Sequence, residues 1–134
     1  MEKDIIKLTI PSQGKYISVA RLTISSIGNS IGLNIDDIED IKVCISEACI
    51  NALDKSENID IEFKIEVDKL TMKVDKVSQY KLEDMEINKE RQLGILIIES
   101  LMDEVHFTEE GVEMIKYIED GHRWKQKNIM NIIV

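Results

Sequence analysis

Residues 38–55 read IEDIKVCISEACINALDK, and the pattern in this stretch decides the fold. Its apolar positions recur every three or four residues, at Ile38, Ile41, Ile45, Ala48 and Ala52. That spacing predicts a helix with one buried face. Glu47 and Asn51 lie one helical turn apart at the border of this face. A carboxylate and an amide placed there can face a cleft while the helix stays anchored in the core. We therefore place the candidate chemical centre at these two residues.

The composition of the 134-residue chain is that of one globular domain, with 43% hydrophobic and 32% charged residues. The net charge of −9 disfavours nucleic acid and anionic membranes as main partners. It suits a basic protein partner, although an acidic surface is also an ordinary route to solubility. The chain starts without a signal-peptide pattern, and no apolar run reaches the roughly 20 residues of a membrane helix. We therefore expect a cytoplasmic protein.

Cysteine and histidine usage gives no metal or disulfide pattern. Cys44 and Cys49 are five residues apart on the predicted helix, so they project to different sides of it. We expect both to be reduced, buried and small apolar side chains. The two histidines, His106 and His122, add no ligand spacing typical of a zinc site.

The remaining elements follow from hydrophobic periodicity. Alternating apolar residues predict five strands, at 4–10, 59–67, 70–74, 104–108 and 112–118. Three-and-four spacing predicts a helix from residue 14 to 31 and, with Gly94 at its opening, another at 93–101. Short links predict two hairpins, one turning at Asp68-Lys69 and the other at residues 109–111. Residues 34–37 supply N-cap candidates for the central helix, and Asp36 followed by Glu39 resembles a capping box there.

Two segments carry no regular pattern. Residues 75–92 are polar and too long for an ordinary loop in a compact domain, so they are either a functional lid or disordered. The tail, residues 121–134, ends in an apolar run that either docks on the sheet or meets a partner. The order of elements predicts an α+β fold in a single domain spanning residues 1–134. It is a two-layer α/β sandwich, with a mixed, mostly antiparallel sheet and helices on one face.

Three stretches resemble a known family. ISEACINA (45–52) is similar to the glutamate-to-asparagine helix motif of the GHKL ATPase superfamily, whose fold is also called the Bergerat fold. RLTISSIGNSIGL (21–33) and GILIIESLMDEV (94–105) resemble the opening helix and the post-lid helix of the small anti-sigma-factor serine kinases, the RsbW/SpoIIAB type. The resemblance covers most of the first 118 residues. It implies that residues 75–93 form a shortened ATP lid.

The resemblance also implies roles for individual residues. Glu47 would be the general base that takes the proton from a serine hydroxyl, and Asn51 would coordinate the Mg²⁺ that bridges the ATP phosphates. Asp75 would accept a hydrogen bond from the adenine amino group. Gly94 would let the backbone approach the phosphates, and Arg91 would contact them from the lid. Outside these motifs, the same residues would be ordinary surface, turn or junction positions.

A protein of this family would hold a sigma factor inactive and use ATP and Mg²⁺ to phosphorylate a serine of an anti-anti-sigma (STAS-type) partner. Such proteins act in transcription regulation during stress response or sporulation. The resemblance further implies a homodimer, formed through the first helix and its sheet edge, without direct contact to nucleic acid or membrane.

The sequence departs from the family pattern around the nucleotide. An Asp-x-Gly motif is replaced by Asp75-Lys76-Val77, and a β-branched residue cannot readily adopt the left-handed backbone that glycine accepts. Gln92 stands where the first glycine of a Gly-x-Gly motif is expected, and Glu113 lies where a threonine is expected. These departures leave a second hypothesis open. In that hypothesis the chain is a nucleotide-independent binding module for a sigma factor or an anti-anti-sigma protein.

Overall fold

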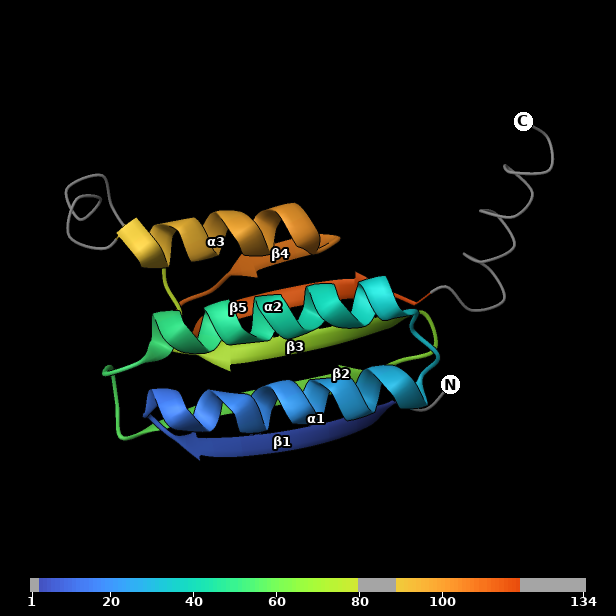
Figure 1. Cartoon of the computed structure of the whole chain (residues 1–134), viewed down its shortest axis with the longest axis horizontal. Coiled ribbons are helices and arrows are strands. Elements are labelled where there is room, and N and C mark those ends of the chain that lie inside the picture. The colour runs from blue at the N-terminus through green and yellow to red at the C-terminus, as the bar shows by residue number, and fades with distance from the viewer. Residues whose placement is uncertain (1–2, 80–88, 119–134) are drawn as a thin grey trace.

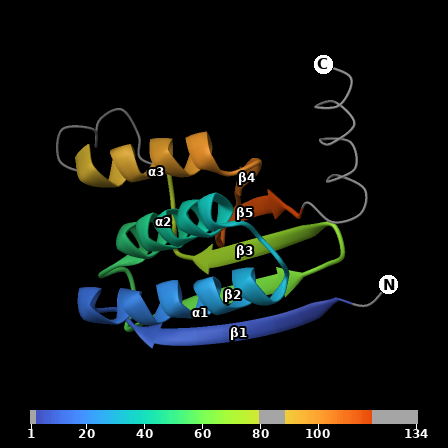
Figure 2. The same cartoon turned by 45° about the vertical axis from the view of Figure 1, so that its right-hand side comes forward.

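The fold was described from a computed structural model, which covers residues 3–79 and 89–118. The elements follow in the order β1 (Asp4–Pro11), the short 3-10 helix η1 (Gly14–Tyr16), α1 (Ile17–Ser30), α2 (Ile35–Ala52), β2 (Asn58–Ile65), β3 (Lys69–Asp75), α3 (Lys89–Leu101), β4 (Glu104–Phe107) and β5 (Gly111–Tyr117). The three α-helices lie side by side over one face of the sheet (Figures 1 and 2). The predicted two-layer α+β sandwich is confirmed.

The five strands form one sheet in the order β1-β2-β3-β5-β4. Every described pairing is antiparallel, where the sequence had suggested a mixed sheet. The reason lies in the second hairpin: β4 runs in the same direction as β3, but β5 inserts between them and separates the two. Both edges of the sheet, β1 and β4, are therefore antiparallel partners of an inner strand.

The core lies between the helices and the sheet, and α2 is its centre. This helix packs between α1 and α3 and above β3. Its apolar stripe is fully buried at Ile41, Ile45 and Ala48, as the sequence predicted. Each large aliphatic side chain buried in this way contributes roughly 1.5–3 kcal/mol to the free energy of unfolding. The core position of α2 fixes where Glu47 and Asn51 lie.

The start of α2 uses the first of the predicted N-cap candidates and not the capping box. The N-cap is Asn34, whose backbone is extended and whose Oδ1 accepts a 2.8 Å hydrogen bond from the backbone N–H of Asp37. The predicted capping box of Asp36 and Glu39 was therefore wrong, because the helix begins earlier and places Asp36 inside its first turn. The helix also ends at Ala52, since Leu53 leaves the helical conformation.

Three further boundaries also differ. The first hairpin turns at residues 66–68 and not at Asp68-Lys69, with the N–H of Glu66 donating to the carbonyl of Lys69. The second hairpin is present, but its turn is Thr108–Glu110 and not residues 109–111. Helix α3 begins at Lys89, so the prediction that Gly94 opens the helix was wrong: Gly94 lies inside it. Much of the predicted lid and the whole 121–134 tail lie outside the described residues.

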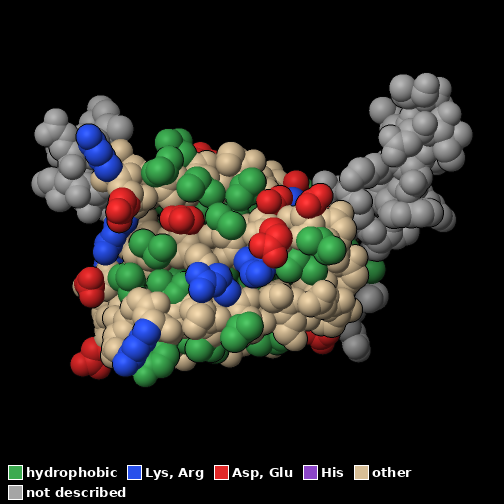
Figure 3. All heavy atoms as spheres, viewed as in Figure 1, with side chains coloured by type: hydrophobic (Ala, Val, Ile, Leu, Met, Phe, Trp, Pro, Cys, Tyr) green, Lys and Arg blue, Asp and Glu red, His purple; other side chains and the backbone are tan. Residues whose placement is uncertain are grey.

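The two surfaces of the sandwich differ in character. On the helical face, hydrophobic side chains lie scattered between charged ones (Figure 3). Leu22 of α1 and Leu96 of α3 are among the exposed large hydrophobic residues. The sheet face without helices carries cross-strand ion pairs, in which Lys73 contacts Glu62 and Glu113 at 3.8 Å each. Within residues 3–79 and 89–118, the helices are too short or too polar to cross a lipid bilayer.

Candidate functional site

The candidate site lies at the C-terminal end of α2. Three parts of the chain converge there: the last turns of α2, the first two turns of α3 and the segment 76–78 that follows β3. Asn51 is completely buried, whereas Glu47 is half-buried. The buried stripe of α2 fixes the backbone positions of both residues, because the helix cannot rotate without exposing its core side chains.

Both polar atoms of the Asn51 amide have partners within the chain. Its Nδ2 donates to the carbonyl oxygen of Ser78 at 3.1 Å, and its Oδ1 accepts from the backbone N–H of Ser78, also at 3.1 Å. Oδ1 accepts a second hydrogen bond from Nζ of Lys55, at 3.0 Å. The amide oxygen therefore uses both of its lone pairs on this chain.

Lys55 was missed by the sequence analysis. Its ammonium donates to Oδ1 of Asn51 at 3.0 Å, to the carbonyl of Lys76 at 2.8 Å and to Oγ of Ser78 at 3.1 Å. Partial burial lowers the pKa of Lys55, and the charge of Arg91 lowers it further. The position of Lys55, four residues after Asn51, was the available signal. That spacing was uninformative because the helix ends at Ala52, before Lys55.

Glu47 faces α3. The absent side chain of Gly94 makes room for it: a Cβ on Gly94 would overlap Oε2 of Glu47 and lie 3.3 Å from its Cδ. Burial raises the pKa of the Glu47 carboxyl, and the negative charge of Glu90 in the first turn of α3 raises it further. A raised pKa makes the ionised carboxylate a stronger base, which is the property that a general base needs.

Arg91 also reaches this site. Its Nη1 lies 3.5 Å from the backbone carbonyl oxygen of Asn51, at the limit of a hydrogen bond. The structure therefore brings together four of the five predicted site residues: Glu47, Asn51, Arg91 and Gly94.

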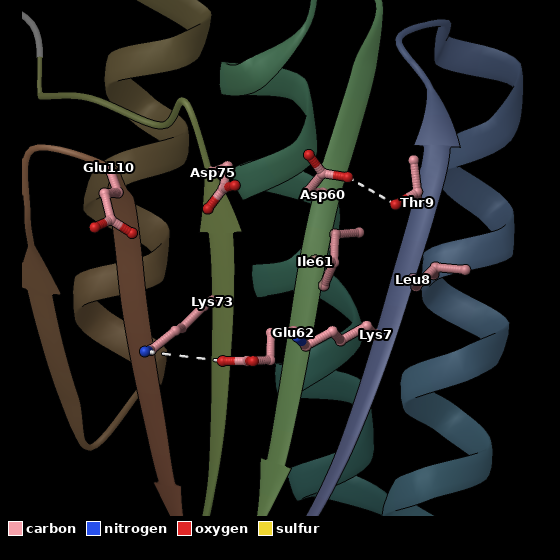
Figure 4. A pocket seen from close by; sticks show the side chains of 9 residues that line it. All are labelled: Lys7, Leu8, Thr9, Asp60, Ile61, Glu62, Lys73, Asp75 and Glu110. Carbon is pink, nitrogen blue, oxygen red and sulfur yellow. Dashed lines mark hydrogen bonds and ion pairs between the residues drawn. The ribbon is translucent and has the colours of Figure 1, made fainter.

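Asp75, the fifth, lies elsewhere. Its side chain projects from the end of β3 to the sheet face without helices (Figure 4). There it lines a cavity of about 420 Å³ together with Lys7, Leu8, Thr9, Asp60, Ile61, Glu62, Lys73 and Glu110. Burial raises the pKa of Asp75, and Asp60 and Glu110 raise it further. The sheet thus separates Asp75 from Asn51, whose side chain lies in the helical layer.

The backbone after β3 explains this placement. The left-handed residue is Lys76, with φ of 70°, and not Val77. Val77 is 2% exposed and belongs to the hydrophobic core. The expected clash at Val77 therefore does not arise, because the turn that needs a left-handed residue comes one position earlier than the sequence suggested.

The other two departures lie on different surfaces. Gln92 lies inside α3, and its Nε2 is enclosed with no hydrogen-bond partner among the described residues. Glu113 projects from β5 to the sheet face without helices, where it pairs with Lys73. Neither side chain replaces the function of the small residue expected at its position.

Two further cavities lie at the same end of the sheet as the candidate site. One of about 340 Å³ is lined by residues 75–78 and 108–110, so it borders the segment 76–78 that contacts Asn51. One of about 160 Å³ lies between the end of β3 and the start of β5. Neither Glu47 nor Asn51 lines any of these three cavities. Residues 3–79 and 89–118 contain no cluster of three or more His, Cys, Asp or Glu side chains able to hold a metal ion.

Comparison with known proteins defines the class of protein. Residues 10–116, from the end of β1 almost to the end of β5, match the histidine kinase-like ATPase domain family. The chain therefore belongs to this family. It is also 36% identical over 141 aligned residues to serine-protein kinase RsbW from Staphylococcus aureus strains bovine RF122 / ET3-1, MRSA252 and Newman. The alignment covers 87% of this chain and 89% of each relative, which confirms the resemblance to the anti-sigma-factor serine kinases.

Proposed function

We propose that this chain is an anti-sigma factor of the RsbW type, which holds a sigma factor and releases it when an anti-anti-sigma (STAS-type) protein binds. The observation that carries this proposal is the identity to RsbW along nearly the whole chain, from β1 to β5. Such a regulator acts in the cytoplasm, where we place this chain. We also propose a homodimer formed through α1 and the neighbouring edge strand β1, on which Ile5 is 48% exposed.

Membership of the histidine kinase-like ATPase domain family implies ATP binding, but in this arrangement two residues expected to hold Mg²⁺ and the phosphates are engaged within the chain. The Asn51 amide, which would ligate the metal, is bonded to Ser78 and Lys55. Gly94 lies within α3, so its N–H belongs to a helix interior and not to a free helix N-terminus. These observations favour the nucleotide-independent form of the proposed function, in which the chain works by binding its protein partners.

The adenine side of the site supports the same form. The resemblance assigns the adenine contact to Asp75. Its side chain projects to the sheet face without helices, on the other side of the sheet from Asn51 (Figure 4). In this arrangement one nucleotide cannot contact both side chains.

The second candidate function is an ATP-dependent protein serine kinase, and Glu47 favours it. Its raised pKa and its position between α2 and α3 suit a base that accepts the proton of a partner's serine hydroxyl. In this candidate, Ser78 would have to leave the Asn51 amide before Asn51 could act as a ligand. Bound Mg²⁺ and ATP would supply the phosphoryl group and neutralise its charge.

The melting temperature with and without Mg-ATP separates the two forms. A ligand at 100 times its dissociation constant adds about 2.7 kcal/mol to the free energy of unfolding. For a domain of this size that corresponds to a shift of several degrees. We expect no shift at millimolar Mg-ATP. A clear shift, together with phosphate transfer to a STAS-type protein that Glu47→Gln abolishes without loss of ATP binding, would establish the kinase.

Capture of the sigma factor tests the function common to both forms. The tagged chain is incubated with the cytoplasmic fraction of its source cells after nucleotide and Mg²⁺ have been removed, and bound proteins are identified by mass spectrometry. We expect a sigma factor and a STAS-type protein. If neither is retained, with or without added Mg-ATP, the anti-sigma proposal is wrong.

A further inference from the structure

We infer that Lys55 is a built-in cation that holds the segment 76–78 over Asn51 and thereby closes the site from within. The inference deepens the nucleotide-independent form of the proposed function and rests on it. Lys55 is a positioning residue in this scheme, since it acts through the backbone that it holds.

The first observation is that the Lys55 ammonium bridges two separate parts of the chain. Among its partners are Oδ1 of Asn51 from α2, and the Lys76 carbonyl and Ser78 Oγ from the segment after β3. These three partners are neutral oxygens, the ligand type that a hard divalent cation also takes. One ammonium with three donors engages all of them at 2.8–3.1 Å. A divalent cation entering this cluster would meet the positive charge of Lys55, with Arg91 nearby.

The second observation is the strained backbone that Lys55 holds. Lys76 has a φ of 70°, which a residue with a long side chain adopts only when its surroundings enforce it. Its N–H donates to the Glu110 carbonyl at 2.8 Å, and its carbonyl accepts from Lys55 at 2.8 Å. The peptide groups on either side of Lys76 are therefore both fixed, one to the β4–β5 turn and the other to Lys55.

The third observation is that the closure is reciprocal. Ser78 is bonded to Asn51 through both its N–H and its carbonyl, and to Lys55 through its hydroxyl. Removing the ammonium leaves Asn51 and Ser78 in place but takes away the charge that links Oδ1, the Lys76 carbonyl and Oγ. The segment 76–78 is then held to α2 by the two neutral Asn51–Ser78 bonds and the burial of Val77.

Amide hydrogen exchange at Ser78 tests the inference, because the N–H of Ser78 is one of the groups that the closure protects. We compare the wild-type chain with Lys55→Met, which keeps the length of the side chain but removes its charge and donors. Lys42→Met is the matched control: Lys42 also belongs to the central segment, but its ion pair with Glu39 is at the surface. The amide of Met72, in the middle of β3, reports global unfolding.

We expect exchange at Ser78 to be at least about tenfold faster in Lys55→Met than in the control, after correction for any change at Met72. Lys55→Arg, which keeps the charge and the donors, should recover part of the protection. We also expect 10 mM MgCl₂ to leave the wild-type protection unchanged. Equal Ser78 exchange in Lys55→Met and Lys42→Met would overturn the inference, and so would a Mg²⁺-dependent change in the wild type.

The outcome is independent of partner binding. If the chain captures no sigma factor but Ser78 loses protection in Lys55→Met, the anti-sigma proposal fails and the built-in cation stands. If capture succeeds and Ser78 is unaffected, the built-in cation fails and the anti-sigma proposal stands.

Discussion

Glu47 on α2 and Gly94 on α3 are in such close contact that a methyl group on Gly94 would occupy the position of the Glu47 carboxylate. The overlap is with the end of a flexible side chain, which can turn aside. We therefore expect Gly94→Ala to fold with a free energy of unfolding within about 1 kcal/mol of the wild type, since alanine also gains helix propensity over glycine. Urea denaturation of Gly94→Ala and the wild type measures the two free energies of unfolding.

Gly111→Ala is the contrasting substitution. A Cβ there would overlap the backbone carbonyl of Val74 and lie 2.9 Å from Cα of Asp75, and neither can move without breaking the β3–β5 pairing. We expect this variant to lose about 2 kcal/mol or more. Equal stabilities for Gly94→Ala and Gly111→Ala would contradict the distinction between a mobile and a fixed neighbour.

The second prediction concerns the pH dependence that Glu47 contributes. Burial, with help from Glu90, raises its pKa in the folded state, so the folded protein binds this proton more tightly than the unfolded chain. The ionised carboxylate therefore destabilises the fold above the folded-state pKa, and this effect disappears as the pH falls to the ordinary value of 4.5 and below. Glu47→Gln should melt higher than the wild type at pH 7 and equal to it near pH 4. A constant difference across this range would mean that the carboxylate carries no such penalty.

The third prediction concerns the buried amide. Asn51→Ala removes the partner of both backbone groups of Ser78 and an acceptor of Lys55, and it leaves a void beside them. We expect a loss of about 2–4 kcal/mol in the free energy of unfolding. Asn29→Ala, at an exposed position on α1, serves as the control and should change stability by less than about 0.5 kcal/mol. A solvated Asn51 side chain would give the same small change in both variants.

The fourth prediction uses the strained backbone after β3. Lys76→Gly relieves a left-handed conformation that costs a side-chain-bearing residue energy, and both backbone hydrogen bonds of residue 76 are kept. We expect it to stabilise the chain by about 0.5–1 kcal/mol. Asp54, with φ of 67°, is the matched position, but aspartate tolerates this region better, so Asp54→Gly should gain less. Thermal denaturation of the two variants shows which substitution raises the melting temperature more.

The fifth prediction concerns the ion pair between Lys116 and Asp37. Lys116 is 7% exposed, and its ammonium lies 3.4 Å from Oδ1 of Asp37 in the first turn of α2. Asp37→Ala leaves a buried ammonium without this partner, whereas Lys116→Met fills the same space with an apolar side chain. Asp37→Ala should therefore be the more destabilising change, by at least about 1 kcal/mol. Chemical denaturation measures both variants. A larger loss of stability in Lys116→Met than in Asp37→Ala would contradict this prediction.

Periodicity predicted the fold well because burial imposes it. The apolar stripe from Ile38 to Ala52 and the alternation along β2 each mark one buried face. Turning a different face of α2 or β2 toward the core would expose several large apolar side chains. The boundaries were less predictable. Asn34 and Asp36 are both good N-cap residues, and only the extended backbone at Asn34 decides between them.

The site was predicted in part, for a similar reason. Glu47 and Asn51 belong to α2, so helical geometry placed them correctly on one side. For Asp75 the sequence predicted only a position at the end of a strand, because the face that its side chain takes depends on strand register, and a shift of one residue transfers a side chain to the opposite face of a sheet. Lys55 was invisible to any local pattern, because its partners Lys76 and Ser78 are distant in sequence and meet it only in the folded chain.

The fastening of α2 at both ends has a mechanical consequence. The Asp37–Lys116 pair ties its first turn to the last residues of β5, and Asn51 ties its last turn to the residues leaving β3 at the opposite end of the sheet. With contacts at both ends, α2 resists sliding along the sheet and rotation about its own axis. A protein that pulls on either end of α2 therefore transmits the force into β5 or β3.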